Sequence, residues 1–375
     1  MATIGYLTTT LFDFGAIKSL PTEMEALGIR RPLLVTDTGV QNAGIADKVL
    51  NHLDLNTVVT FANTPPNPTE EAVREGATAY RDGGCDGVIA LGGGSPIDLA
   101  KGVALAVTHE GPLEHYAAIH GGVGRITAKV APVIAIPTTA GTGSEVGRGA
   151  LLNLTNGSKL ALISPHLFPK RAICDPELTL GLPPLLTAAT GIDALTHCIE
   201  TYLSPLVNPP AEAIALDGAR RVWRFIERAV KDGADREARW EMMMAALEGG
   251  LTFQKGLGAV HSLSHAAGAL RAPTLHHGML NGVLLPHVLR FNDGYVGEKY
   301  AVLLDLFSLD KDADLAGAVE GLLKRLNLPV TLGEMGFRQE HIAGTVTRAM
   351  ADHSNATTPR RPSAEDFETL LRAAL

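Results

Sequence analysis

Short apolar segments alternate with helix-period segments through the first half of the chain, and this alternation restricts the fold more than any other feature. The apolar segments are mostly continuous, without a polar residue at every second position, which is typical of strands buried on both faces of a parallel sheet. They lie at residues 31–37, 57–62, 86–91, 132–137 and 171–175. Segments with helical spacing separate them, for example at residues 70–81 and 96–107. The pattern predicts a doubly wound α/β unit.

The second half of the chain has a different character. Past Pro183 and Pro184 it is rich in Ala, Leu, Glu and Arg with helical spacing, and it shows no convincing strand. A chain of 375 residues is long enough for two domains with hydrophobic cores. We therefore predict an α/β domain over residues 1–182 and an all-helical domain over residues 183–375. The helical domain includes the acidic tail, which carries a helical pattern from Ser363.

Charge and cysteine content exclude several classes of protein. The 32 Lys and Arg residues against 40 Asp and Glu residues leave a net charge of −8, which argues against nucleic-acid binding. No apolar run reaches the ~18 residues of a membrane span, and the first twenty residues do not resemble a signal peptide. Cys85, Cys174 and Cys198 are odd in number and far apart, which is typical of reduced thiols. We expect a cytoplasmic protein that binds neither nucleic acid nor membrane.

A glycine-rich loop follows the third apolar segment. After Leu91 come Gly92–Gly94, Ser95, Pro96 and Asp98. Ser95 suits a helix N-cap, Pro96 suits the first helical position, and Asp98 completes a Ser-x-x-Asp capping box. A helix that begins in this way directs free N–H groups at a phosphate, although a tight structural bend explains a bare glycine turn equally well. The loop matches neither the G-x-G-x-x-G dinucleotide fingerprint nor the Walker A motif.

A second loop and an acidic residue make nucleotide binding the better interpretation. Residues 138–145 form a stretch rich in hydroxyl groups and glycine after the apolar segment 132–137. Ligands of open α/β sheets bind beyond the carboxyl ends of strands, so both loops can serve one ligand. Asp37 ends the first clear strand, where it can bind a ribose 2′-hydroxyl and repel the 2′-phosphate of NADP. A helix N-cap or turn explains Asp37 equally well.

Histidines are concentrated in one part of the helical half. Asp193 and His197 lie four residues apart on one predicted helix face, and His261 and His265 repeat that spacing on another. With a histidine from the next loop, two such helices can supply four nitrogen and oxygen ligands to iron(II) or zinc. The spacing alone does not say which histidines are ligands. The five histidines between positions 261 and 287 are His261, His265, His276, His277 and His287.

Together these motifs identify a family. From about residue 31 to residue 292 the sequence resembles the iron-containing (group III) alcohol dehydrogenases, and it is most similar to the 4-hydroxybutyrate dehydrogenase branch. The resemblance implies the dehydroquinate synthase-like fold, with a dinucleotide-binding Rossmann-like α/β domain followed by an all-helical metal-binding domain. The motifs that carry it are GGGSPIDLAK, IPTTAGTGSEV, DALTHCIE, the His261–His265 pair and HHGMLNGVLLPHVLRFN.

The resemblance also assigns roles to residues. His265 looks like a catalytic histidine close to the nicotinamide that carries protons and does not bind the metal. The spacing from His265 to His277 is slightly longer than is usual in the family, so His276 is an alternative to His277 as a ligand. Asp37 matches the acid associated with NAD preference. The implied metal ligands are Asp193, His197, His261 and His277. The other implied cofactor contacts are Gly93, Gly94, Ser95, Asp98, Thr138, Thr139, Thr142, Asn67 and Lys159.

The predicted activity is metal-dependent interconversion of a primary alcohol and its aldehyde with NAD(H). Iron(II) is the expected metal, zinc is possible, and the expected substrate pair is 4-hydroxybutyrate and succinate semialdehyde. A hydroxy acid needs a cation in the pocket, and Arg148 and Lys255 are basic residues inside the motifs. Alternatively, Arg148 binds a cofactor phosphate or a structural acid, and Lys255 is solvated.

Three other activities fit the same fold. The first is a general primary-alcohol or diol dehydrogenase, and the second is a reductase of another anionic aldehyde, such as a sulfo- or phosphono-aldehyde. A metal-free enzyme like maleylacetate reductase is the third, and the complete set of one aspartate and three histidines argues against it. The resemblance suggests a homo-oligomer, a dimer or larger.

Overall fold

The computed structural model describes residue 6 and residues 8–155, 159–270 and 272–375. The chain divides into two compact units, one built on a sheet and one helical. The sheet unit comprises Tyr6–Thr139 and Gly143–Gly181, and the helical unit comprises Leu182–Leu375 with Ala140–Thr142. Three residues of the threonine-rich loop therefore group with the helical unit, which the sequence pattern did not indicate.

Within the described residues, six parallel strands form one sheet in the order β1-β8-β5-β4-β2-β3, and β6 and β7 form an antiparallel pair. The five predicted strands are confirmed as β2, β3, β4, β5 and β8, and so is the doubly wound α/β class. The strands are β1 (Thr9–Phe12), β2 (Pro32–Val35), β3 (Val59–Phe61), β4 (Gly87–Gly92), β5 (Val133–Pro137), β6 (Gly149–Asn153), β7 (Lys159–Ile163) and β8 (Arg171–Cys174).

Three strands, β1, β6 and β7, were not predicted from the sequence, and each has a physical reason. Strand β1 is short, half-exposed and paired only with β8, so it has no long apolar run. Strands β6 and β7 alternate between buried and half-buried positions, but apolar residues occupy both kinds of position and hide the period of two.

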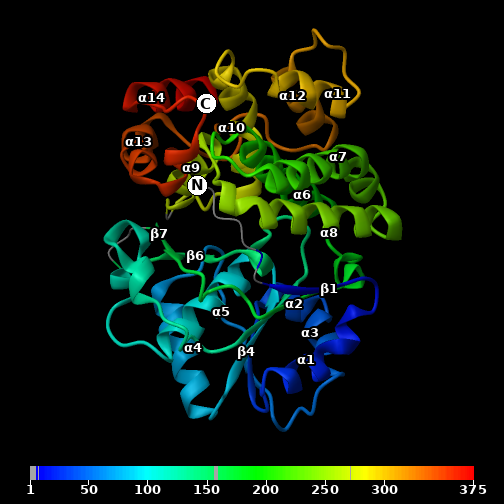
Figure 1. Ribbon diagram of the computed structural model, residues 1–375, viewed down its shortest axis with the longest axis vertical. Coiled ribbons are helices and arrows are strands. Elements are labelled where there is room, and N and C mark those ends of the chain that lie inside the picture. The colour runs from blue at the N-terminus through cyan, green and yellow to red at the C-terminus, as the bar shows by residue number, and fades with distance from the viewer. Residues whose placement is uncertain (1–5, 7, 156–158, 271) are drawn as a thin grey trace. The chain divides into compact units, whose positions relative to one another are not determined.

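Alternate residues of the central strands face two separate hydrophobic cores. On β4, Val88 and Ala90 pack with residues of α4 and α5, whereas Ile89 and Leu91 pack with residues of α1 and α3. Figure 1 shows these two pairs of helices on opposite sides of the sheet. This two-sided burial explains the continuous apolar runs. The helices of the sheet unit are α1 (Leu20–Ala26), α2 (Thr38–Asn42), α3 (Ile45–Leu50), α4 (Glu70–Asp82) and α5 (Gly94–Ala106), with 3-10 helices η1 (Ala16–Ser19), η2 (Leu113–Tyr116), η3 (Ala118–His120), η4 (Gly122–Arg125), η5 (Ser144–Val146) and η6 (Pro176–Thr179).

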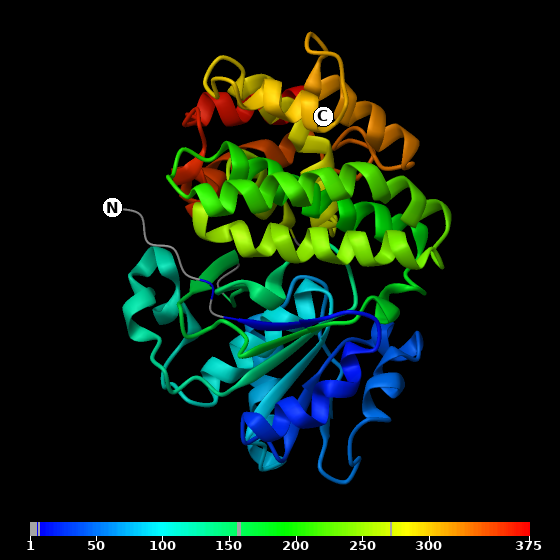
Figure 2. The same cartoon turned by 45° about the vertical axis from the view of Figure 1, so that its right-hand side comes forward.

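The helical unit is organised around α6, which is buried along most of its length because α7, α8 and α10 pack against it. Figure 2 shows α7 and α8 as long green ribbons that lie side by side. No helix in the described part of the chain is long and apolar enough to cross a membrane. The helices are α6 (Pro184–Leu203), α7 (Pro209–Lys231), α8 (Arg236–Leu251), α9 (Ala259–Gly268), α10 (His277–Asn292), α11 (Lys299–Leu306), α12 (Leu315–Arg325), α13 (Ile342–Ala351) and α14 (Ala364–Ala373), with 3-10 helices η7 (Thr252–Lys255), η8 (Gln339–His341) and η9 (His353–Thr357).

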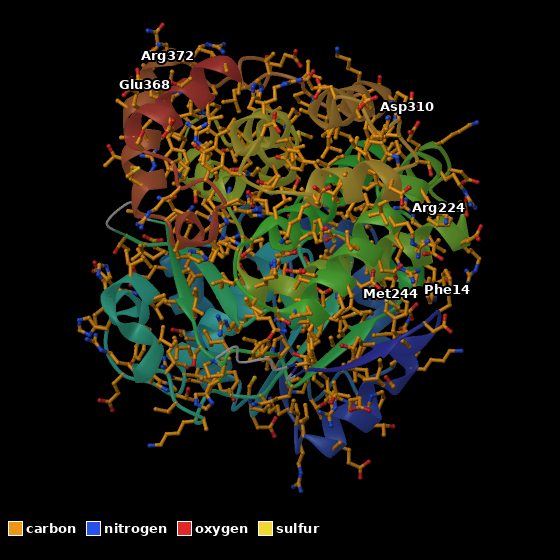
Figure 3. The ribbon with its side chains drawn as sticks, turned by 45° about the horizontal axis from the view of Figure 1, so that its top comes forward. Phe14, Arg224, Met244, Asp310, Glu368 and Arg372 are labelled. Atoms are coloured by element: carbon orange, nitrogen blue, oxygen red, sulfur yellow. The ribbon has the colours of Figure 1, made fainter. Side chains whose placement is uncertain are left out.

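The last helix, α14, confirms the helical pattern predicted from Ser363. The Ser363 side chain accepts a hydrogen bond from the Asp366 backbone, and the Asp366 carboxylate accepts one from the Ser363 backbone, which completes a capping box. Phe367 is buried on the inner face. On the outer face Glu368 and Arg372, one turn apart, form an ion pair of 2.7 Å (Figure 3). The helix is amphipathic, as its sequence pattern indicates.

Candidate active site

Four side chains with metal-binding atoms meet inside the helical unit. Asp193 and His197 lie one turn apart on α6, His261 comes from α9, and His277 is the first residue of α10. The Asp193 Oδ1 lies 3.5 Å from Nε2 of His197, 3.9 Å from Nε2 of His261 and 3.6 Å from Nε2 of His277. All four ligand atoms lie within 4.8 Å of one another. The structure thus brings together the four residues that the resemblance implied as ligands.

The separations and chemistry of this group fit one divalent ion. Two ligands of a tetrahedral zinc stand about 3.4 Å apart when each bond is about 2.1 Å long. Burial, together with the neighbouring His197 and His265, holds the pKa of His261 well below its usual value, so the ring is neutral and can act as a ligand. One carboxylate and three imidazoles form a donor set suited to iron(II) or zinc.

Glu200, which the sequence analysis did not single out, orients one of these ligands. It lies on α6 and is buried, and its Oε2 accepts a hydrogen bond of 2.6 Å from Nδ1 of His261. The backbone N–H groups of Gly258 and Val260 donate to the same carboxylate at 3.0 and 2.7 Å, so Glu200 also caps the start of α9. Burial raises the pKa of Glu200 to about 7, although these backbone bonds oppose the shift. Since Nδ1 of His261 is engaged, Nε2 is directed toward the other ligands.

Asn281 is the second residue that holds the ligands in place. Its Nδ2 donates to Asp193 Oδ1 at 2.7 Å and lies 3.2 Å from Nε2 of both His261 and His277. His276 is the N-cap residue of α10 and does not join the four-residue group. Of the two adjacent histidines, His277 is the one whose ring faces the other ligands.

His265 lies one turn beyond His261 on α9 and is not part of the four-residue group. Its Nδ1 lies 3.0 Å from Oδ2 of Asp352. Burial alone would raise the pKa of Asp352, but its interactions with His265 outweigh burial and hold that pKa well below the usual range. No sequence motif pointed to Asp352, which is 87 residues from its partner. Together the two residues form an aspartate–histidine pair beside the metal ligands.

In the sheet unit, the two predicted loops meet at the carboxyl ends of the neighbouring strands β4 and β5. Strands β4 and β5 are parallel and in register, with Gly92 opposite Pro137. The backbone N–H of Thr138 donates to the Gly92 carbonyl at 3.0 Å. A side-chain Cβ on Gly93 would lie 3.3 Å from the Thr139 hydroxyl, so the glycine loop and the threonine loop are adjacent.

The predicted capping of α5 is wrong. The helix begins at Gly94, with Gly93 as N-cap and no side chain bonded to the cap, so Ser95 lies inside the first turn and is not the N-cap. Gly92 has a φ of 148°, and this glycine conformation lets the chain turn directly from strand into helix. Backbone N–H groups therefore remain at the helix start, as phosphate binding requires.

Asp98 and Lys101 brace the following loop. Instead of closing a capping box, Asp98 accepts hydrogen bonds from the Ser144 hydroxyl at 2.6 Å and from the Leu151 backbone at 3.0 Å. The buried ammonium of Lys101 donates to the Ser144 carbonyl at 2.7 Å and to the Gly149 carbonyl at 2.7 Å. Burial lowers the pKa of Lys101 to about 8. No sequence pattern indicated this role of Lys101.

Four candidate cofactor residues remain, which are Asp37, Asn67, Lys159 and Thr142. Asp37 is the N-cap of α2 and accepts a hydrogen bond from the Val40 backbone at 2.8 Å, as one of its two interpretations required. Asn67 accepts a hydrogen bond of 2.9 Å from the Lys159 ammonium, so these two distant residues lie together. Thr142 is half-buried in the segment that groups with the helical unit.

The two predicted substrate residues differ in their exposure to solvent. Arg148 is exposed and follows η5. Lys255 is buried, and its ammonium donates to the carbonyls of Thr201 and Ser204 at 2.9 and 2.6 Å and pairs with Glu212 at 3.0 Å. Burial lowers the pKa of Lys255 to about 8, although Glu212 opposes the shift. These contacts contradict the predicted roles of Lys255 as a substrate ligand and as a solvated residue, because its hydrogens are used inside the helical unit.

Comparison with known proteins agrees with this geometry. The family model described as "Iron-containing alcohol dehydrogenase" matches residues 8–176, and its C-terminal counterpart matches residues 187–375. The chain belongs to the iron-containing alcohol dehydrogenase family. As a member, it is an oxidoreductase that acts on CH–OH groups, which confirms the predicted family, enzyme class and fold.

Three relatives of this alcohol dehydrogenase are informative. It is 52% identical to a 4-hydroxybutyrate dehydrogenase of Cupriavidus necator, with 100% of each chain covered. A solved 1,3-propanediol oxidoreductase superposes with a TM-score of 0.93 at 34% identity, over 100% of both chains. A sulfoacetaldehyde reductase of Bifidobacterium kashiwanohense, solved in complex with NAD+, superposes with a TM-score of 0.88 at 28% identity, over 100% of this chain and 98% of the other.

Proposed function

We propose that this iron-containing alcohol dehydrogenase interconverts 4-hydroxybutyrate and succinate semialdehyde with NAD(H). The observation that carries the proposal is the 52% identity to a 4-hydroxybutyrate dehydrogenase over the full length of both chains. The helical unit supplies the metal donors, and the sheet unit supplies a helix N-terminus for the cofactor phosphates and a basic residue. The proposal also includes a cytoplasmic homo-oligomer, as the sequence analysis predicts.

Asp193, His197, His261 and His277 hold the metal in this proposal, with iron(II) the expected ion and zinc an alternative. A bound divalent metal supplies Lewis acidity for the substrate oxygen. The protein's contribution is to hold the four donors in place. Glu200 fixes the ring of His261, and Asn281 fixes the Asp193 carboxylate.

The sheet unit binds the cofactor, whose nicotinamide supplies the hydride chemistry. The N-terminus of α5 at Gly93, Gly94 and Ser95 binds the pyrophosphate, with Thr138 and Thr139 beside it. Asp98 supports the neighbouring loop through its bond to the Ser144 hydroxyl, and Thr142 is a further proposed cofactor contact. Asn67 and Lys159 bind the adenosine part. Asp37 favours NAD, since its negative charge repels the 2′-phosphate of NADP.

His265 moves the proton in the proposed reaction. Asp352 accepts the hydrogen on Nδ1 of His265, which leaves Nε2 able to accept a proton from the alcohol or to return one to the aldehyde. Asp352 is here a positioning residue, since it acts through His265. The pair resembles the acid–histidine part of a catalytic triad, in which the acid selects the tautomer.

Arg148 binds the substrate carboxylate in this proposal. It is exposed, its guanidinium is planar, and a bidentate bond to a carboxylate is the geometry it favours. A charge-assisted hydrogen bond is worth about 1.5–3 kcal/mol, which corresponds to about 10- to 100-fold in binding. Arg148→Ala should therefore raise KM for 4-hydroxybutyrate by about that factor and leave KM for 1-butanol almost unchanged. Equal changes for both alcohols would show that Arg148 does not bind the carboxylate.

A second candidate is a reductase of another anionic aldehyde, which the similarity to the sulfoacetaldehyde reductase favours. The deciding experiment measures NADH oxidation with succinate semialdehyde, sulfoacetaldehyde and butanal, with iron(II) and zinc supplied separately. We expect kcat/KM to be highest for succinate semialdehyde. A higher value for sulfoacetaldehyde would transfer the assignment to the second candidate, and a higher value for butanal would exclude both.

A further inference from the structure

A second group of metal-binding side chains lies in the helical unit, outside the four proposed ligands. His265 of α9, Asp352 and His353 each offer one ligand atom, and these atoms lie within 4.8 Å of one another. His265 is buried, Asp352 is half-buried and His353 is exposed. The group is thus anchored in the interior at one end and open to solvent at the other.

We propose that His265, Asp352 and His353 form a second, weaker site for Zn²⁺, and that zinc bound there inhibits the enzyme. Two imidazoles and one carboxylate form a ligand set that binds first-row divalent metals and leaves positions for water. Imidazole nitrogen suits zinc better than magnesium or calcium, which prefer oxygen ligands. Zinc also stands above iron(II) in the general order of affinities, so zinc is the better occupant for a weak site of this kind.

The geometry of the second group is close to that of the first. Nδ1 of His265 lies 3.0 Å from one oxygen of Asp352, and Nδ1 of His353 lies 3.7 Å from the other. The corresponding separations from Asp193 to its three histidines are 3.5 to 3.9 Å. The rings of His265 and His353 are nearly parallel, at 16° with centroids 5.9 Å apart. A zinc ion needs only small side-chain adjustments to contact all three residues.

Asp352 is held in position before any ion arrives. One of its oxygens accepts a hydrogen bond of 2.8 Å from the Ser354 backbone, which makes Asp352 the N-cap of η9. The same carboxylate faces His265 on the neighbouring helix, since α9 packs against η9. A preorganised carboxylate of this kind lowers the entropic cost of binding.

Zinc at the second site would change what His265 can do. With the metal on Nδ1, the ring hydrogen moves to Nε2, the nitrogen that the proposed function uses as proton acceptor. The inhibition therefore rests on the proposed role of His265, whereas the binding does not. Three ligands with one exposed make the site weaker than the four-ligand site, so it fills second.

The binding test titrates Zn²⁺ into enzyme that already holds one zinc per chain, with equilibrium dialysis and metal analysis as readout. We expect a second equivalent to bind the unaltered enzyme. His353→Ala should weaken that second equivalent by roughly tenfold or more, since even the loss of a residue behind a ligand costs 10- to 100-fold. His120→Ala is the matched control, because His120 is also an exposed histidine, 3.7 Å from the Glu114 carboxylate, and it should leave both equivalents unchanged.

Each result of the binding and inhibition measurements either supports or contradicts the second zinc site. Binding of a single equivalent, or equal second-site affinity in His353→Ala and His120→Ala, would overturn the site. In the aldehyde-reduction assay, added Zn²⁺ should inhibit the unaltered enzyme and the His120→Ala variant but not His353→Ala. A second equivalent that binds without inhibition would support the site and refute the proton role of His265, so failure of the site and failure of the proposed function are separable.

Discussion

Replacement of Glu200 by glutamine tests whether the residue behind a ligand controls metal affinity. Glutamine has the same shape, so α6 should keep its packing, but an amide cannot replace both carboxylate oxygens. We expect Glu200→Gln to bind Zn²⁺ about 10- to 100-fold more weakly, as is typical for loss of such a partner, or about 1.4–2.7 kcal/mol.

The expected loss of Zn²⁺ affinity follows from the hydrogen bonds that Glu200 accepts. Oε1 of Glu200 accepts one hydrogen bond, from the Val260 backbone at 2.7 Å. Oε2 accepts the bonds from the Gly258 backbone at 3.0 Å and from Nδ1 of His261 at 2.6 Å. The least disruptive amide orientation places the NH2 group at the Oε1 position, which retains the bond to His261 but sets the new NH2 donor against the N–H donor of Val260. The retained bond is also weaker, because bonds to charged acceptors contribute about 1.5–3 kcal/mol and neutral ones about 0.5–1.5 kcal/mol.

The assay measures the Zn²⁺ dissociation constant of metal-free protein by competition with a chelator at pH 8, above the raised pKa of Glu200. Thermal unfolding of the metal-free protein is measured in parallel, because the lost bond at α9 should lower Tm. Glu70→Gln is the matched control. Glu70 is also buried, accepts bonds of 3.1 Å from the Thr155 backbone and hydroxyl, and lies in the sheet unit.

Glu70→Gln should lower Tm and leave the Zn²⁺ dissociation constant unchanged. A similar drop in Tm for Glu200→Gln, with a Zn²⁺ dissociation constant within twofold of that of the unaltered protein, would contradict this prediction. In that case Glu200 would serve only as the cap of α9.

Three further predictions follow from the same structure. Asp37→Ser removes a charge but keeps an N-cap side chain for α2, so the ratio of kcat/KM for NADP to that for NAD should rise while Tm changes little. Lys101→Met leaves the carbonyls of Ser144 and Gly149 without their buried donor, at about 1–3 kcal/mol for each orphaned group, so the midpoint of urea unfolding should fall clearly. Burial raises the pKa of Glu248 to about 8 from 4.5, although Arg221 opposes the shift. Between those pH values the folded state holds a proton that the unfolded state has lost, so stability falls as pH rises, and Glu248→Gln should raise Tm more at pH 9 than at pH 6.

Local patterns were sufficient for most of the secondary structure. Continuous apolar runs predicted the inner strands, because a strand buried on both faces needs apolar residues at every position. The same rule failed for β1, a strand of four residues with one exposed and three half-buried positions. It also failed for the β6–β7 hairpin, where apolar side chains occupy half-exposed positions.

The start of α5 shows a different limit of sequence reasoning. Ser95, Pro96 and Asp98 have the composition of a capping box, yet the register of β4 and the positive φ of Gly92 place the helix start at Gly94. Asp98 is then drawn to Ser144, a residue of another loop. Local capping preferences are worth about 1 kcal/mol, which tertiary contacts readily exceed.

Residue spacing was enough to indicate a metal site in the helical half, but it did not say which histidines are the ligands. The i, i+4 spacing of Asp193 and His197 places both on one face of any helix that they occupy, because the helical period is 3.6 residues. The partners of these groups depend on how the whole chain folds. Glu200 reaches His261 across 61 residues, and Asp352 reaches His265 across 87. Lys255 donates hydrogen bonds to carbonyls inside the helical unit and pairs with Glu212, although its motif suggested a ligand for substrate. Hydrogen bonds and burial depend on distances in the folded chain, and no local spacing encodes those distances.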